Sequence, residues 1–441
     1  MSLASLYQDH LREISRRADR ALERSGFDAL AVHSGAPIIR FLDDQSYPFV
    51  VNPHFRAWVP ASAPHSWLFY QPGQRAKVVF YQPSDYWHST PATPTDHWVE
   101  EVDLIVTHEP DAARQHLPSG RLAAIGEPGT MPDWDWDFTD LNPSLLLASL
   151  HYDRAIKTDY EIECMRRATT LGVRGHRAAA RAFEAGASEF EIHVAYLQAT
   201  GTTEAELPYS NIIALNEHAA VLHHTVLDTQ APTGADRRSF LIDAGAAFRG
   251  YACDITRTHT TRRDGVYRAL IDAVDDLQQE LCGRVRAGTD YAEIHLAAHH
   301  GIAGILRDAG IVDAKPDEAV ETGLSAVFFP HGIGHLIGLQ VHDVAGFMVD
   351  RQGQQKPAPA GHPYLRLTRR LEPGFVVTIE PGIYFVPLLL EQAQRSDHRT
   401  RIDWHVVEQL VPYGGIRIED DVVCTVEAPE NLTRSAFAKS G

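Results

Sequence analysis

The sequence predicts an α+β protein with a smaller N-terminal mixed α/β domain followed by a larger C-terminal domain. The chain of 441 residues exceeds what one ordinary hydrophobic core accommodates. Short apolar runs bounded by turn residues alternate with longer runs of helical periodicity. The pattern also changes within residues 131–146, after which helical patterns begin. We therefore expect one domain at residues 1–155 and a second at residues 156–441.

The N-terminal domain is predicted to begin with an amphipathic helix that ends at Gly26, since glycine readily adopts the left-handed conformation that stops a helix. Short apolar runs bounded by Pro, Gly or Asp then predict strands, at residues 28–35, 66–70, 77–82 and 103–107. Aromatic, proline-rich loops lie between them, such as residues 41–60 and 86–98. Such loops more often cover a site or contact a partner than act as plain linkers.

Capping boxes mark the starts of helices in the C-terminal domain. Thr158 pairs with Glu161, and Ser188 pairs with Glu191 before a helix that stops at Gly201. A third helix is expected at about residues 291–308, ending near Gly310. Strand-like runs alternate with these helices, at residues 210–216, 239–248, 375–385 and 415–426.

Composition and charge exclude several functional classes. Hydrophobic residues make up 44% of the chain, as in globular proteins, and the net charge of −18 argues against a nucleic-acid partner. No apolar run reaches the roughly 18–20 residues that cross a membrane, and the N-terminus lacks the apolar core of a signal peptide. Four scattered cysteines without a CxxC pair indicate reduced thiols. The sequence thus predicts a cytoplasmic protein that binds neither nucleic acid nor membrane.

Four carboxylates stand inside apolar, strand-like runs of the C-terminal domain. An ionised carboxylate is costly to bury unless a cation compensates its charge. Each one alone is typical of a turn or a cap, but four together indicate one shared cation, such as a bound metal. These residues are Asp243, Asp254, Glu380 and Glu419.

The stretch "FFPHGIGHLIGLQVHD" adds imidazoles to this set, and His335 is the candidate ligand. Oxygen-rich donors favour Mn²⁺, Co²⁺ or Fe²⁺. Five protein ligands exceed the number that a tetrahedral zinc takes, and they fit two metals about 3.5–4 Å apart. Gly332 and Gly334 are expected to let the backbone approach a metal or a substrate.

The order of five motifs resembles the pita-bread metallopeptidases (peptidase family M24), which include methionine aminopeptidase, aminopeptidase P, prolidase and creatinase. These motifs are "IDAG", "CDITRT", "HGIGHLIGLQVHD", "IEPGIYF" and "GIRIEDD". The chain is most similar to bacterial Xaa-Pro dipeptidases (prolidases), including the organophosphorus acid anhydrolase group. The resemblance covers nearly the whole chain, with "FLDD", "YPF", "VNPHFRAWVP" and "DYWH" in the N-terminal domain. It implies a pita-bread catalytic domain at residues 156–441.

The resemblance also implies a role for each metal-site residue. Asp243 would bind one metal, while Asp254 and Glu419 would bridge both metals. His335 and Glu380 would complete the ligand set of the second metal. Glu380 would also carry a proton to the leaving nitrogen.

Further residues are implied in catalysis and substrate binding. His342 would hydrogen-bond the tetrahedral intermediate, His331 would line the site, and Arg417 would support substrate or transition-state charge. The residues implied in substrate binding are His223 and Arg369, for the substrate carboxylate, and Tyr209, Tyr291 and Val341, for the pocket. Two of these assignments stay open, because His224 follows His223 and Arg370 follows Arg369. Only the register of the motif decides which residue of each pair is meant.

The implied function is an Mn²⁺-dependent dipeptidase, with Co²⁺, Fe²⁺ or Zn²⁺ as alternative metals. It would release C-terminal proline from Xaa-Pro dipeptides by attack of a metal-bridging hydroxide, with organophosphorus ester hydrolysis as a side activity. The N-terminal domain would restrict substrate length, and the resemblance implies a homodimer. The alternatives are aminopeptidase P acting on longer peptides and a non-enzymatic binding protein on the same fold. Creatinase is a weaker alternative, because it works without a metal centre.

Overall fold

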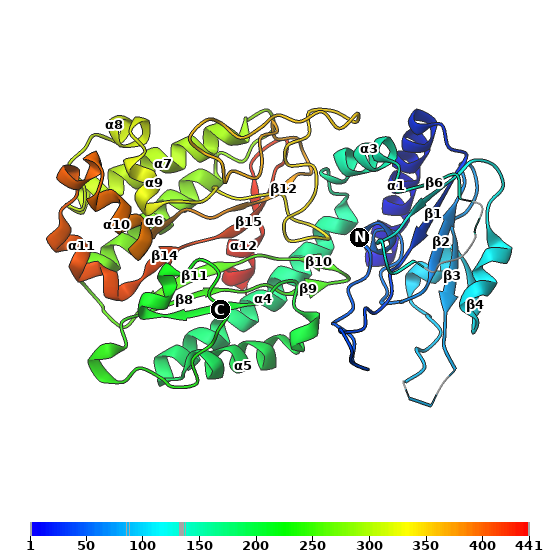
Figure 1. Ribbon diagram of the computed structural model, residues 1–441, viewed down its shortest axis with the longest axis horizontal. Coiled ribbons are helices and arrows are strands. Elements are labelled where there is room, and N and C mark those ends of the chain that lie inside the picture. Colours follow the sequence, from blue (N-terminus) through cyan, green and yellow to red (C-terminus); the bar gives the residue numbers. More distant parts are fainter. Residues whose placement is uncertain (1, 85, 88, 132–135, 137, 440–441) are drawn as a thin grey trace. The chain divides into compact units, whose positions relative to one another are not determined.

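The structure is a computed structural model that describes residues 2–84, 86–87, 89–131, 136 and 138–439 (Figure 1). The chain divides into two compact units. The first comprises Met1–Arg154, Thr158–Glu163 and Met348–Gln354, and the second comprises Ala155–Lys157, Cys164–Phe347 and Gln355–Gly441. Parts of the "DYWH" motif and of the pattern change within residues 131–146 lie outside the described residues.

The first unit is built on a six-stranded sheet in the order β4-β3-β2-β1-β5-β6. β2 runs antiparallel to β1 and β3, whereas the pairs β1–β5, β3–β4 and β5–β6 are parallel. The strands are β1 (Ala29–His33), β2 (Trp67–Tyr70), β3 (Lys77–Tyr81), β4 (Asp103–Thr107), β5 (Leu122–Ile125) and β6 (Asp140–Leu141). The helices are α1 (Leu3–Ser25), α2 (Pro53–Arg56) and α3 (Ser144–Arg154). The predicted mixed α/β character of this part of the chain is confirmed.

Sequence signals explain where α1 ends and which of its faces is buried. Gly26 adopts φ +74°, and its N–H donates to the carbonyls of Glu23 and Leu22, so the predicted stop is confirmed. The buried residues recur at helical spacing and form one apolar stripe, which includes Tyr7, Leu11, Ile14, Ala18 and Leu22. β1–β4 fall inside the four predicted strand runs.

The second unit contains two halves of similar construction, each with a three-stranded sheet and a two-stranded ribbon. The first half has the sheet β11-β8-β7 and the ribbon β10-β9, and the second has the sheet β12-β15-β16 and the ribbon β13-β14. The strands of the first half are β7 (Ile212–Leu215), β8 (Ser239–Asp243), β9 (Ala247–Phe248), β10 (Tyr251–Ala252) and β11 (Thr256–Thr260). Those of the second half are β12 (Val376–Ile379), β13 (Gly382–Tyr384), β14 (Gly415–Arg417), β15 (Asp420–Val423) and β16 (Glu430–Asn431).

Helices cover these sheets. α5 packs on β7, while α6 contacts β12 and β14, and Figure 1 shows α4 and α5 on one side of β8 and β11 with α6 and α7 on the other. The helices are α4 (Asp159–Ala185), α5 (Glu189–Thr200), α6 (Val266–Cys282), α7 (Tyr291–Asp308), α8 (Pro316–Glu321), α9 (Leu324–Phe328), α10 (Pro387–Gln394), α11 (Trp404–Leu410) and α12 (Leu432–Lys439). Both predicted capping boxes are present, at the starts of α4 and α5. Among the described residues, no helix has the combination of length and hydropathy that a membrane crossing requires.

The four carboxylates singled out by the sequence occupy equivalent places in the two halves, where a sheet strand meets a ribbon strand. Asp243 ends β8 just before β9, and Asp254 lies between β10 and β11. Glu380 lies between β12 and β13, and Glu419 lies between β14 and β15. A β-bridge between Thr256 and Glu419 joins the halves at this level, which brings all four junctions together.

Candidate metal centre

The centre is a buried group of carboxylates around one imidazole. Ligand atoms of Asp254, His335 and Glu419 lie within 4.8 Å of one another, and all three residues are buried. His335 donates from Nδ1 to the carbonyl of Leu336 (3.0 Å). This bond turns Nε2 toward the carboxylates, 3.6 Å from Asp254 Oδ2 and 4.0 Å from Glu380 Oε1. The imidazole is therefore oriented as in metal sites, with its second nitrogen anchored to a carbonyl.

Donors on neighbouring strands hold the other carboxylates. Arg417 Nη2 donates to Asp243 Oδ2 (2.6 Å), and the Tyr209 hydroxyl donates to Asp243 Oδ1 (2.9 Å). The same hydroxyl also lies within hydrogen-bond distance of Asp254 Oδ1. Because it carries one hydrogen, it donates to one of the two aspartates at a time. On the opposite side Thr256 Oγ1 donates to Glu419 Oε2 (2.6 Å).

Burial and like charges set the protonation of this group. Burial raises the pKa of Asp243 to about 6 and that of Glu380 to about 7, although the charge of Arg417 opposes both shifts. Burial, together with the charges of Asp254 and Glu380, raises the pKa of Glu419 well above its ordinary value. Without a metal, protons therefore neutralise part of this buried charge at neutral pH.

Asp254 and His335 behave as an ion pair. Burial alone would raise the pKa of Asp254, but the hydrogen bond and charge of His335 outweigh it and lower that pKa. Burial would lower the pKa of His335, but Asp254 and Glu380 raise it. Asp254 is thus the carboxylate that stays ionised most readily in the metal-free protein.

The donor set fits divalent metal ions. Four carboxyl groups and one imidazole converge, and burial and mutual repulsion disfavour the ionised state of three of the carboxyls. A cation among them would remove both penalties. Oxygen-rich sets of this kind suit hard or borderline divalent ions.

The other histidines of residues 328–343 lie around the cluster. His331 Nδ1 is 3.6 Å from Glu380 Oε2, and His331 Nε2 lies 2.9 Å from the Tyr384 hydroxyl. Tyr384 also accepts from Arg417 Nη1 (2.8 Å). His342 is exposed, with its ring centroid 4.4 Å from that of His335. His331 also lines a cavity of about 270 Å³.

Two glycines of the histidine-rich stretch pack closely against neighbouring backbone. A Cβ on Gly334 would lie 2.2 Å from the carbonyl oxygen of Thr378, and one on Gly332 would lie 2.7 Å from that of Tyr364. Gly334 has φ +151°, a conformation that other residues rarely adopt. These glycines allow close packing against neighbouring backbone, and their approach to a metal or a substrate stays a prediction.

Glu189, in the first turn of α5, holds the loop that carries the predicted substrate histidine. Its carboxylate accepts from His218 Nδ1 (2.8 Å), His224 Nε2 (3.0 Å) and the backbone N–H groups of Leu215 and Asp228. Burial would raise the pKa of Glu189, but these four hydrogen bonds lower it. The sequence presents this residue only as an acidic group in a helix N-terminus and does not indicate its role.

The loop distinguishes the two adjacent histidines. His224 is bound to Glu189, whereas His223 is exposed and its charge lowers the pKa of both His331 and His342. His223 is therefore the one that lies on the side of the cluster.

The two adjacent arginines also differ. Arg369 is buried, stacks on the Phe375 ring at 4.7 Å and forms an ion pair with Glu372 (2.8 Å). Arg370 is exposed and donates to the carbonyl of Gly288.

The predicted pocket residues lie at different depths. Tyr209 contacts two carboxylates of the cluster, as described above. Tyr291 is fully buried and donates to the carbonyl of Thr378 (2.7 Å), while Val341 is half-buried beside His342. Tyr291 is close enough for Glu380 to raise its pKa, together with burial.

Two family models match the chain. Residues 5–152 match the Xaa-Pro dipeptidase N-terminal domain, and residues 163–426 match metallopeptidase family M24. The chain belongs to metallopeptidase family M24. The predicted family, and with it a peptidase hydrolase, is confirmed. The metallopeptidase family and the donor set together imply that divalent metal ions take part.

Similar members of family M24 span the whole chain. The Xaa-Pro dipeptidase of Xanthomonas campestris pv. campestris (strain B100) is 54% identical over 445 residues, with 99% of each chain covered. That of Stenotrophomonas maltophilia (strain K279a) is 52% identical over 437 residues, with 98% of each covered.

Solved structures confirm the predicted pita-bread fold. Pseudomonas aeruginosa aminopeptidase PepP superposes with a TM-score of 0.73 at 23% identity, covering 98% of this chain and 99% of that one. A His350Ala form of Escherichia coli aminopeptidase P gives 0.72 at 22% identity, covering 99% and 96%. At these identities the likeness concerns the fold alone.

Proposed function

We propose that this chain is an Xaa-Pro dipeptidase, which hydrolyses Xaa-Pro dipeptides and releases proline. The observation that carries the proposal is the 54% identity to an Xaa-Pro dipeptidase over 99% of both chains. Aminopeptidase P is similar at only 22–23% identity, which does not extend beyond the fold. A non-enzymatic role is disfavoured, because all five candidate ligand positions are occupied by residues that can bind metal.

The proposed metal ligands are Asp243, Asp254, His335, Glu380 and Glu419, for two divalent ions. Mn²⁺ is the proposed metal, since four of the five donors are carboxylates. When bound, such ions lower the pKa of a coordinated water and supply hydroxide as the nucleophile at neutral pH.

Glu380 is proposed to move the proton that the leaving nitrogen needs. A catalytic acid or base works best when its pKa lies near the working pH. Glu380 lies among the proposed ligands, with Oε2 3.6 Å from His331 Nδ1 and Oε1 4.0 Å from His335 Nε2, and this position at the reacting centre supports the assignment. An amide nitrogen leaves poorly unless it is protonated, so a group of this kind is required.

Three cationic or imidazole groups are proposed to stabilise charge on the substrate during the reaction. Arg417 is buried beside Asp243 and Tyr384, where its charge is little screened. His331 and His342 flank the cluster. Burial lowers the pKa of His331 to about 3, and partial desolvation, with the neighbouring charge of His335, lowers that of His342 to about 4. Both rings are therefore neutral at physiological pH. The one N–H of His331 donates to the carbonyl of Gly332 (2.8 Å), so His342 is the ring that is proposed to donate to the substrate.

The substrate carboxylate is proposed to bind His223 and Arg369. His223 is favoured over His224, because His224 is engaged by Glu189. Tyr209, Tyr291 and Val341 are proposed to line the pocket for the dipeptide, and the N-terminal domain (residues 1–155) to limit substrate length.

The decisive experiment compares a dipeptide with a tripeptide. Metal-stripped protein is reloaded with Mn²⁺, and hydrolysis of Ala-Pro is compared with that of Ala-Pro-Ala. We expect Mn²⁺ to restore Ala-Pro hydrolysis and the tripeptide to be a poorer substrate. A preference for the tripeptide would instead assign the chain to the aminopeptidase P activity. No rescue by Mn²⁺, Co²⁺, Fe²⁺ or Zn²⁺ would contradict the proposal.

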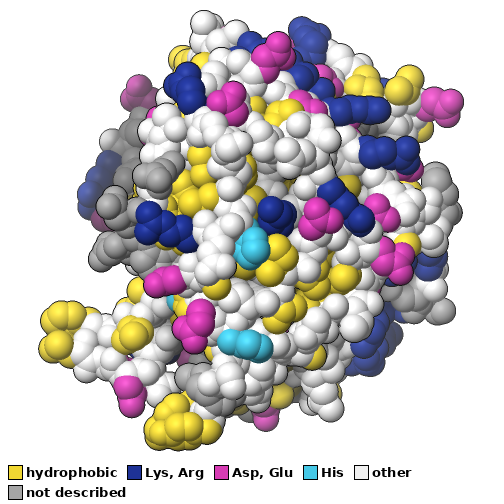
Figure 2. Space-filling model, turned by 90° about the vertical axis from the view of Figure 1, so that its right-hand side faces the viewer, with side chains coloured by type: hydrophobic (Ala, Val, Ile, Leu, Met, Phe, Trp, Pro, Cys, Tyr) yellow, Lys and Arg dark blue, Asp and Glu magenta, His cyan; other side chains and the backbone are white. Residues whose placement is uncertain are grey.

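We also propose that the chain is a homodimer in the cytoplasm. Large hydrophobic side chains of residues 38–50 are strongly exposed, with Phe41 at 89% and Leu42 at 90%. Figure 2 shows hydrophobic side chains on protruding parts of one face. Apolar surface of this kind marks an interaction site. A cytoplasmic location fits the four cysteines, which are buried and form no disulfide bond.

The dimer is tested by light scattering after size-exclusion chromatography. A Phe41→Ser/Leu42→Ser variant should shift the mass toward that of one chain. Val426→Ser, which alters a side chain that is 81% exposed elsewhere, should not. A monomeric wild-type protein would contradict the proposal.

A further inference from the structure

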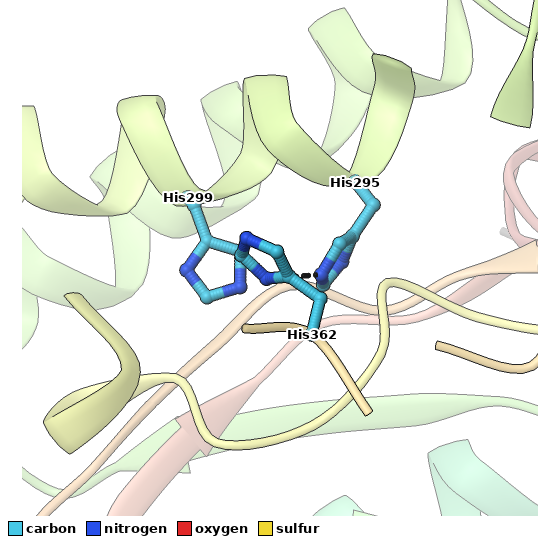
Figure 3. Close-up of side chains that lie close together, drawn as sticks. All are labelled: His295, His299 and His362. Carbon is cyan, nitrogen blue, oxygen red and sulfur yellow. Dashed lines mark hydrogen bonds between the residues drawn. The ribbon is translucent and has the colours of Figure 1, made fainter. Parts of the chain in front are cut away.

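Three histidines outside the carboxylate cluster converge on one point (Figure 3). His295 and His299 lie on α7, four residues apart, so their side chains share one face of the helix. His362 lies in the loop between α9 and β12. The ring centroids are 4.7 Å apart in each of the three pairs, and one nitrogen of each ring lies within 4.8 Å of the others.

The hydrogen bonds orient the rings toward each other. His295 Nε2 and His362 Nδ1 are 2.9 Å apart, so one of them donates to the other. His299 Nδ1 lies 2.9 Å from Ser325 Oγ, so Nε2 is the nitrogen of this ring that can bind a metal. A second ring nitrogen bonded to a polar neighbour is the usual way to fix a metal-binding imidazole.

These rings are neutral at physiological pH. Burial, with the neighbouring histidines, lowers the pKa of His295 to about 2 and that of His299 to about 3. Burial also lowers the pKa of His362. A neutral imidazole keeps a lone pair on one nitrogen, and that is the form that binds a metal.

We propose that His295, His299 and His362 form a further metal site, separate from the carboxylate cluster, which binds one Zn²⁺ ion. Three imidazoles are a common protein ligand set for zinc with an open fourth position. The group lines a cavity of about 270 Å³, which has ample room for a water as the fourth ligand.

The two sites differ in the metals that they prefer. An all-nitrogen set favours Zn²⁺, Ni²⁺ or Cu²⁺, whereas carboxylates favour Mn²⁺. One chain can therefore hold Mn²⁺ and Zn²⁺ at the same time. The zinc ion would lie in the cavity that His331 also lines.

The test uses the full chain with the carboxylate cluster disabled. An Asp254→Asn/Glu419→Gln variant is titrated with Zn²⁺ in a calorimeter, and its bound zinc is counted after gel filtration. We expect one Zn²⁺ per chain. Adding His299→Ala should weaken binding at least about 100-fold, since even the loss of an outer hydrogen-bond partner costs about 10–100-fold.

His300→Ala is the matched control, since His300 is the next residue on α7 but is half-buried and paired with Asp317 (3.3 Å). It should leave zinc binding unchanged. His362→Ala provides a second test on a loop, where a change disturbs folding least, and circular dichroism checks that each variant is folded.

The proposal is overturned if the cluster-disabled variant binds no zinc, or if His299→Ala and His362→Ala both bind as much as their parent. Should the cluster-disabled variant not fold, crystals of Mn²⁺-loaded wild-type protein soaked in Zn²⁺ decide the matter. An anomalous peak at the zinc edge between the three rings supports the site, and its absence contradicts it. These outcomes do not depend on dipeptide hydrolysis.

Discussion

Arg417 connects the carboxylate cluster to the residues that surround it. Its guanidinium donates to Asp243, to Thr256 Oγ1 (3.2 Å) and to the Tyr384 hydroxyl. Thr256 in turn donates to Glu419, so one buried cation supports carboxylates from both halves of the unit. Its single charge is not enough to keep Asp243 fully ionised, because burial still raises that pKa to about 6. The cluster thus has a deficit of positive charge that metal ions would fill.

Replacing His335 and replacing His342 should have different effects on the protein. His335→Ala removes the imidazole that faces Asp254, so Mn²⁺ affinity should fall at least about tenfold. His342→Ala should keep the metal and lose about 100-fold in kcat on Ala-Pro, the usual contribution of one positioned proton donor or acceptor. Metal analysis after gel filtration and steady-state kinetics separate the two effects. Loss of metal from His342→Ala, or full activity in both variants, would contradict these roles.

At the level of single residues, the sequence indicates which groups meet but not what holds them. The carboxylates can be recognised because each interrupts an apolar run, and a buried charge needs a partner. Thr256 and Tyr384 carry no such signal, since a threonine or tyrosine in a strand is ordinary. Their importance depends on partners far away in sequence, such as Glu419 at 163 positions from Thr256.

The stretch from His331 to His342 is held against β12 by backbone contacts. Leu336 forms a β-bridge with Val377, and His335 and Thr378 exchange hydrogen bonds in both directions. The position of the imidazole therefore depends on how closely Gly334 approaches Thr378.

Gly334→Ala should destabilise the protein. Its Cβ would lie 2.2 Å from a backbone oxygen, which cannot move like a flexible side chain, and overpacking of this kind costs about 1–3 kcal/mol or more. Gly304→Ala is the matched control, since Gly304 lies inside α7 with no atom within 4 Å of the added carbon. It should stabilise the helix by about 0.5–1 kcal/mol. Urea unfolding measures both; equal stabilities for the two variants would contradict the packing argument.

Elements with marked ends can be predicted from the sequence, while those defined by distant pairing cannot. α1 and α5 agree with prediction because Gly26 and the Ser188 capping box set their ends. β5 gives no clear signal, since "LAAI" suits a helix as well as a strand and its place depends on pairing with β1. The short ribbon β9–β10, which precedes Asp254, is likewise too short for any periodicity to show.

At the scale of the whole molecule, the centre depends on both halves of the second unit. Each half contributes two carboxylates from equivalent junctions, and the bridge between Thr256 and Glu419 joins them. The same arrangement concentrates negative charge in one buried place, so the stability of the protein should depend on pH and metal together.

The stabilisation that metal provides should grow as pH rises from 5 to 8. In the metal-free fold the pKa values of Asp243 and Glu380, about 6 and about 7, lie above those of the unfolded chain. Their protonation stabilises the fold fully below about pH 4, and this contribution is lost as pH rises through 6 and 7. Bound Mn²⁺ compensates the ionised carboxylates, so the Tm gap between loaded and metal-free protein should widen by roughly 5 °C.

Calorimetry on matched samples at each pH tests this expectation. Buried neutral histidines such as His176, whose pKa burial lowers to about 3, destabilise both forms as pH falls below about 6.5. This effect is the same in both forms, so it cancels in the Tm difference between loaded and metal-free protein. A gap that stays constant or narrows toward pH 8 would contradict the protonation state assigned to the cluster.

The raised pKa values of the buried carboxyls also make metal uptake an exchange reaction. At neutral pH the metal-free site holds hydrogen ions on part of the Glu380 population, and the raised pKa of Glu419 favours its protonated form. An incoming metal has to displace them into the surrounding solution. Protons and metal ions therefore compete for the same carboxylates, so the affinity of the site for metal should fall as the pH falls.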